Sequence, residues 1–209
     1  MIPYLTGLFA ADTIASIEHA QYVFEEIVRR TPDSLGDDER SALLMAFGSL
    51  AMEHFRSIVM LCRSGVATGS ALALFRPLLE AIIRGEWLYF CADDDQMNRF
   101  MRNNFSLHSI GFAAMARAVD EKKGFGTRLS LFVPYHAQLS DYTHSGHDAV
   151  AQRIANDGGV EPTYPESRIR ALVAQSSMAL VLHYQIVCEA KGYQSNFDSL
   201  AELFASIQT

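Results

Sequence analysis

The sequence predicts a single all-α domain, a helical bundle of about six to seven helices with a central up-and-down core. Apolar residues recur at three- and four-residue spacing along most of the 209 residues, and no segment alternates as a half-buried strand would. The chain is 49% hydrophobic and 20% charged, a composition that excludes an intrinsically disordered chain. No repeat or linker divides the sequence, so residues 1–209 are expected to form one domain.

Capping residues and helix breakers place the first four helices. The first is expected to begin near Asp12 or Thr13 and to end at the segment TPDSLGDD. The second begins between Asp37 and Ser41 and ends at SGVATGS, and the third covers about residues 70–90. Acidic residues 93–95 suit the start of a fourth helix, because negative charge complements the positive end of the helix dipole. This helix is expected to run to about residue 119.

The rest of the chain is expected to contain three more helices. Pro134 suits the first position of a helix that loosens at Ser145 and Gly146 and resumes to about residue 154. The segment NDGGVEPTYP predicts a long surface loop. A long helix over about residues 166–190 and a short one over 197–207 then close the chain.

The charge balance limits the classes of partner. A formal net charge of -7 argues against a broad nucleic-acid-binding surface and against binding to anionic membranes, since both depend on a basic face. The N-terminus lacks the basic segment of a signal peptide, and no run of about 18 apolar residues is free of charge. The three cysteines form neither a disulfide framework nor a zinc motif. We therefore expect a soluble, cytoplasmic protein with no membrane partner.

The third helix carries charges in an otherwise apolar segment. Arg76, Glu80 and Arg84 follow one another at four-residue spacing, which places them on one face of the helix. A carboxylate between two guanidinium groups is neutralised locally, and this matters because burying an unpaired charge is costly. Two interpretations follow: a structural ion pair that joins bundle helices, or a polar pocket in which Arg76 holds an anion.

A second group of polar residues lies in the segment PYHAQLSDYTHSGHD. On a continuous helix one face would carry four of them: His136, Ser140, His144 and His147. Three functional interpretations are open: half of a metal site from Asp141 and His144, a nucleophile and base from Ser140 and His144, or an acid-base role for His144 opposite Arg76. The structural alternative is a polar helix end whose side chains bond nearby carbonyl groups.

The second helix contributes two further candidates, Glu53 and His54. His54 falls on the apolar stripe of the helix, so it is expected to point inward. If these side chains met Glu80 and His144, the bundle core would hold two carboxylates and two imidazoles. The repeated Glu-x-x-His pair of di-iron bundles is absent from the sequence, however, so no metal is expected.

These residues resemble a known group of proteins. The string AMEHFRSIVMLCRSGVATGSALALFRPLLEAIIRGEWL and the later HAQLSDYTHSG resemble uncharacterised bacterial helical proteins placed near the HEPN superfamily of helical-bundle ribonucleases and nucleotide-binding domains. The resemblance covers about residues 45–150. It implies recurring motif positions at seven residues: Glu53, His54, Arg76, Glu80, Trp87, Ser140 and His144. It brings no substrate or cofactor.

The HEPN resemblance also implies an alternative catalytic pair. The HEPN signature is an arginine followed by a polar residue, with a histidine four to six residues after the arginine, and Arg102, Asn103 and His108 fit it. On a continuous helix a gap of six residues separates two side chains by about 120° around the axis. Convergence would therefore need a bend or a helix start between Arg102 and His108, and the sequence shows no breaker there.

The leading hypothesis is a binding or regulatory module for a small anionic or nucleotide-like ligand. Its pocket would lie at the centre of the bundle and be lined by six residues: Glu53, His54, Arg76, Glu80, Ser140 and His144. Two alternatives remain: a metal-independent HEPN-type ribonuclease that acts through Arg102 and His108, in a toxin or defence role, and a structural oligomerisation module. In each case a homo-oligomer, a dimer, is expected. The sequence identifies neither a reaction nor a cofactor.

Overall fold

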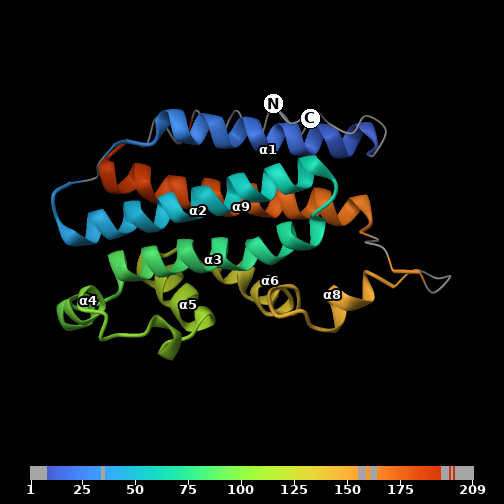
Figure 1. Cartoon of the computed structure of the whole chain (residues 1–209). Helices are drawn as coiled ribbons and strands as arrows, with labels where there is room; N and C mark the ends of the chain where they lie inside the picture. The colour runs from blue at the N-terminus through green and yellow to red at the C-terminus, as the bar shows by residue number, and fades with distance from the viewer. Residues whose placement is uncertain are drawn as a thin grey trace.

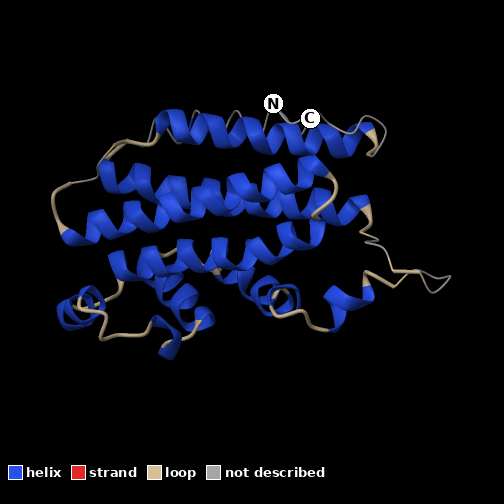
Figure 2. Cartoon of the chain, viewed as in Figure 1, coloured by secondary structure: helices blue, strands red, loops and turns tan. Residues whose placement is uncertain are grey.

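A computed structural model describes residues 9–33, 36–154, 159–160, 164–193, 198 and 200. This part of the chain contains nine α-helices and no β-strand, its one extended pairing being a single bridge between Ile154 and Val160 (Figure 2). The all-α prediction is confirmed. The bounds are α1 Ala11–Arg30, α2 Glu39–Ser64, α3 Thr68–Phe90, α4 Asp94–Met101, α5 Phe112–Lys123, α6 Val133–Gln138, α7 Ser140–Thr143, α8 His147–Ala151 and α9 Glu166–Lys191.

Four long helices, α1, α2, α3 and α9, form the bundle, and the short helices α4–α8 lie along the far side of α3 (Figure 1). The most extensive contact joins α2 to α3, which run antiparallel, so that Phe47 packs against Gly85. Helix α9 instead runs parallel to α1, with Glu166 beside Thr13 and Tyr184 beside Arg30. The parallel direction arises because the short helices lead the chain from the C-terminal end of α3 back to its N-terminal end, where α9 begins (Figure 1).

Helix α3 lies at the centre, as its apolar sequence predicts. Leu78, Leu79, Ile82 and Ile83 are all buried, and α3 contacts α2 on one side, α9 on another and the short helices on a third. A helix that is apolar on nearly every side is stable only when other elements cover every side. Polar groups on α3 therefore lie at the junction of the bundle with the short helices or inside the core.

The fourth helix is much shorter than predicted. Helix α4 ends at Met101, and a 3-10 turn over Leu107–Ser109 precedes α5, which begins at Phe112. Asn103, with φ of 56°, and Gly111, the N-cap of α5 with φ of 83°, both have a positive φ, which a right-handed helix cannot contain. Asn and Gly reach this conformation at the lowest cost, so both breaks have a local cause. The prediction of one helix to residue 119 was wrong.

The helix predicted from Pro134 divides into α6, α7 and α8. The chain turns at Ser145, which has φ of 56°, and at Gly146, where a Cβ would lie 2.6 Å from the carboxylate carbon of Asp141. The Asp141 carboxylate accepts the backbone N–H of Asp148 at 3.0 Å and so caps α8. The predicted loosening is therefore a complete break, and the single polar face that a continuous helix would present does not form.

The other long helices agree with the sequence prediction within a few residues. The loop expected over NDGGVEPTYP is described only in part, and the closing helix expected over 197–207 lies almost wholly outside the described residues. By length and composition alone, the segments Glu39–Ser64 and Glu166–Ala190 could each cross a membrane. Core helices of soluble proteins pass the same test, and most of the apolar window in the second segment is buried inside the bundle.

Candidate functional site

Four side chains form an ionic cluster where α3 meets α6. Glu80 accepts a hydrogen bond from Arg76 Nε at 2.9 Å, and its other oxygen lies 2.7 Å from a terminal nitrogen of Arg84. Nε2 of His136, on α6, lies 2.9 Å from Glu80 Oε1. We call Arg76, Glu80, Arg84 and His136 the arginine cluster. The predicted spacing on α3 is confirmed, and the contact with α6 was not foreseen.

The arginine cluster keeps Glu80 ionised and carries an excess of positive charge. The hydrogen bond with His136, together with those from Arg76 and the charge of Arg84, lowers the pKa of Glu80 from 4.5 to about 2. Two guanidinium groups therefore share one carboxylate. In the described part of the chain the terminal nitrogens of Arg76 have no hydrogen-bond partner, and the side chain is 22% exposed. An anion can reach this guanidinium.

A neighbouring aromatic ring fixes the position of His136. Phe112, the first residue of α5, stacks on the imidazole with the ring centroids 3.9 Å apart and the planes 5° from parallel. The ring is thereby held with Nε2 directed at Glu80. The sequence predicted His136 on a polar helix face. Its partner, Glu80, follows only from the packing of α6 against α3.

A groove of about 540 Å³ opens beside the C-terminal half of α3. Phe47, Phe100 and Phe105 supply its aromatic surface, and Arg84, Asn103, Asn104 and His108 supply most of its polar groups. We call these seven residues the aromatic groove. Arg84 belongs to both features, because the nitrogen that contacts Glu80 also lies 3.4 Å from Nδ1 of His108. The arginine cluster and the aromatic groove are therefore continuous.

The other four residues of the predicted pocket lie outside the arginine cluster. Glu53 and His144 are exposed, whereas His54 is half-buried, and burial lowers the pKa of its imidazole. Ser140 lies on α7, which packs against α3, but neither Ser140 nor His144 makes a side-chain hydrogen bond to Arg76 or Glu80. The structure thus brings together Arg76 and Glu80 from the predicted set and adds Arg84 and His136.

The two residues of the HEPN-type alternative have different surroundings. Because α4 ends at Met101, Arg102 and His108 do not lie on one continuous helix, and the 120° separation expected from such a helix does not apply. Arg102 is exposed, however, and does not line the aromatic groove. His108 does line it, and the guanidinium beside its imidazole is that of Arg84.

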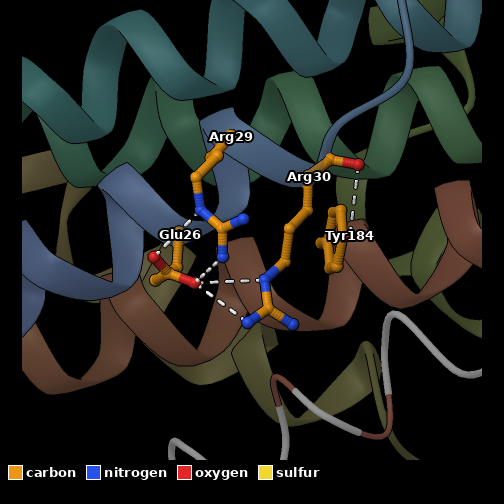
Figure 3. Close-up of polar contacts among 4 residues, drawn as sticks. All are labelled: Glu26, Arg29, Arg30 and Tyr184. Atoms are coloured by element: carbon orange, nitrogen blue, oxygen red, sulfur yellow. Dashed lines mark hydrogen bonds and ion pairs between the residues drawn. The ribbon is translucent and has the colours of Figure 1, made fainter.

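A second group of arginines lies near the end of α1 and pairs with a carboxylate of the same helix. Figure 3 shows the Glu26 carboxylate between Arg29 and Arg30, whose terminal nitrogens lie 2.6 Å and 2.9 Å from it. The Tyr184 hydroxyl donates to the backbone carbonyl of Arg30 at 3.4 Å and so joins α9 to α1. Hydrogen bonds from Arg29 and Arg30 lower the pKa of Glu26, so this carboxylate is ionised at neutral pH.

A buried polar pair in the bundle core escaped the sequence analysis. Glu86 on α3 is fully buried, and its Oε1 lies 3.0 Å from Nδ1 of His183 on α9. Burial raises the pKa of Glu86, because a carboxylate loses its hydration there. Among the described residues, Oε2 of Glu86 and Nε2 of His183 have no hydrogen-bond partner. The signal was present in the sequence, since each residue interrupts an apolar segment of its helix.

Metal ligation finds no support in the described ranges. No group of three or more His, Cys, Asp or Glu side chains lies close enough there to hold a metal ion. Asp141, one half of the metal site considered from the sequence, instead caps α8. The chemistry that the arginine cluster offers is recognition of anions.

Comparison with known proteins gives one match, to a family. Residues 48–208 match a family described as a family of unknown function (DUF6988). No curated protein and no solved structure matches the chain. The matched segment contains α3 and α6, and so all of the arginine cluster, as well as Phe100, Phe105 and His108 of the aromatic groove. The chain belongs to the DUF6988 family, whose function is unknown.

Proposed function

We propose that the protein is a cytoplasmic binding or regulatory module for a small, phosphate-bearing ligand of nucleotide type. The observation that carries the proposal is the double contact of Arg84, which meets Glu80 in the arginine cluster and His108 in the aromatic groove. A guanidinium group presents several N–H donors in a plane, and this arrangement suits phosphate oxygens.

The arginine cluster and the aromatic groove would bind different parts of the ligand. The phosphate would lie against Arg84 and His108, with the excess positive charge of the arginine cluster behind it. A planar base would lie along Phe100 and Phe105, since every base has a face that stacks on an aromatic ring. The side-chain amides of Asn103 and Asn104, both exposed in the aromatic groove, would bond the edge of the base.

Titration calorimetry with a purine nucleoside 5′-monophosphate tests the proposal. The nucleotide should bind more tightly than either the nucleoside or inorganic phosphate, because each of these lacks one half of the contacts. Arg84→Gln should weaken nucleotide binding about tenfold or more, the effect of one charge-assisted hydrogen bond. Arg117→Gln is the matched control, because Arg117 is exposed on α5 and lies outside both features. Equal affinities of the wild type and Arg84→Gln would refute the proposal.

An HEPN-type ribonuclease is the second candidate, and the position of His108 in the aromatic groove favours it. In this alternative His108 would act as the acid or base, and Arg84 rather than Arg102 would hold the phosphate, since Arg84 is the arginine beside it. RNA cleavage by the wild type that is lost in His108→Ala and kept in Arg102→Gln would support this assignment. RNA left intact by the wild type would exclude it.

A further inference from the structure

A second cavity, of about 330 Å³, opens at the opposite end of α3, where α3 meets α6–α8 and the start of α9. It shares no lining residue with the arginine cluster or the aromatic groove. Its volume is at the lower end of the range for sites that bind small molecules. Six of its residues define what we call the tyrosine cleft: Leu72, Phe75, Gln138, Tyr142, Arg168 and Gln175.

The tyrosine cleft contains a cation that forms no ion pair with any described residue. Arg168, in the first turn of α9, is half-buried, and no carboxylate of the described residues lies within ion-pair distance of it. Its guanidinium donates to the Tyr142 hydroxyl oxygen and lies 5.5 Å from the centre of the Tyr142 ring. The Tyr142 hydroxyl and ring that hold the guanidinium are neutral, and the Asp148 carboxylate in the same cavity does not pair with it, so the charge of Arg168 is available to a ligand.

Tyr142 is arranged to donate a hydrogen bond. Its oxygen accepts from Arg168, and no described residue accepts the hydroxyl proton in return. Burial raises the pKa of Tyr142, so the hydroxyl keeps this proton at neutral pH. Arg168 and Tyr142 together therefore present adjacent N–H and O–H donors, which match the two oxygens of one carboxylate.

The remaining walls indicate the rest of the ligand. Leu72, Phe75 and Leu172 give the cavity an apolar surface, which favours a ligand with an apolar body. The carboxylate of Asp148 also lines the cavity, and it would repel a second negative charge. A dianion such as phosphate is therefore disfavoured there, in contrast to the arginine cluster.

From these contacts we infer that the tyrosine cleft binds a small monocarboxylate with an apolar body, held through its carboxylate by Arg168 and Tyr142. The sequence signal is the spacing of four lining residues in α6, in α7 and at the residue between them: Tyr135, Gln138, Leu139 and Tyr142. These are three or four residues apart, so they share a helix face, different from the one that holds His136. This site does not depend on the proposed nucleotide site.

Calorimetry with four probes tests the inference. 4-Methylpentanoate supplies both the charge and the apolar body, 4-methylpentanamide lacks the charge, acetate lacks the apolar body, and inorganic phosphate carries too much charge. The first should bind, and each of the others should bind at least about tenfold more weakly. Equal affinity for the acid and the amide, or no binding of the acid at millimolar concentration, would overturn the inference.

Variants locate the site and separate it from the nucleotide site. Arg168→Gln should weaken binding of 4-methylpentanoate about tenfold or more, and Tyr142→Phe, which keeps the ring and removes the hydroxyl, should weaken it several-fold. Arg170→Gln is the matched control, because Arg170 pairs with Asp12 at 3.2 Å and does not line the cleft. Circular dichroism confirms that each variant is folded. Unchanged affinity in a folded Arg168→Gln would refute the inference, whatever the outcome with nucleotides.

Discussion

Substitution of Gly48 by alanine tests how tightly the core encloses His183. A Cβ at position 48 would lie 2.6 Å from Nε2 of His183, closer than packed atoms can approach, so the imidazole must move. The adjoining cavity of about 20 Å³ has room for one water molecule but not for an imidazole ring. Movement of His183 would therefore break its 3.0 Å contact with Glu86.

The expected cost follows from two opposing contributions. Loss of a hydrogen bond that involves a charged group costs about 1.5–3 kcal/mol, whereas alanine is favoured over glycine inside a helix by about 1 kcal/mol. We expect Gly48→Ala to lower the free energy of unfolding by about 0.5–2 kcal/mol, measured by urea denaturation followed by circular dichroism. For a chain of this length, that loss lowers the melting temperature by roughly 1–8 °C.

Two comparisons make the Gly48 result decisive. Ser49→Ala changes an exposed neighbour on the same helix and should alter stability by less than about 0.5 kcal/mol. In a background with Glu86→Gln and His183→Ala, Gly48→Ala should become stabilising by up to about 1 kcal/mol, because nothing then opposes the methyl group. If Gly48→Ala costs no more than Ser49→Ala, or costs the same in both backgrounds, the proposed contact does not control packing at this position.

Two further predictions concern pH, and their signs are opposite. Because the pKa of Glu80 is lowered from 4.5 to about 2, its stabilising effect is present above pH 4.5 and is lost as the pH falls toward 2. Glu80→Gln should thus be less stable than the wild type at pH 7 by up to about 3 kcal/mol, and the difference should disappear near pH 2; a constant difference would contradict the ionic role. Because the pKa of Glu86 is raised above 4.5, burial of this carboxyl is tolerated best at acid pH and becomes costly as the pH rises through the raised value. Glu86→Gln should therefore gain stability over the wild type as the pH rises above 4.5, measured by urea unfolding, and parallel pH profiles would refute this.

The long helices could be predicted because their signals are local. Helical spacing of apolar residues and the breakers between them placed α1, α2, α3 and α9 within a few residues. The short helices could not be placed in the same way. Helix α4 ends where Asn103 adopts a positive φ, but asparagine also occurs inside helices, so the residue type alone does not mark a helix end. Helix α8 begins where Asp141 caps it, and no local sequence pattern specifies that contact.

The candidate site was predictable only along one helix. The contacts of Glu80 with Arg76 and Arg84 follow from four-residue spacing, and the sequence identified these three residues. The contact with His136 depends on how α6 crosses α3, which no local pattern specifies. Arg168 was missed for the same reason, because its role depends on Tyr142, which lies 26 residues earlier in the chain.

The close approach of Gly48 to His183 has a consequence for the evolution of the family. The two residues lie on different helices far apart in the sequence, yet the size of one limits the size of the other. In relatives that carry a larger residue at the position of Gly48, we expect a smaller or apolar residue in place of His183, together with a neutral residue in place of Glu86. These three positions should therefore change together, whatever ligand each relative binds.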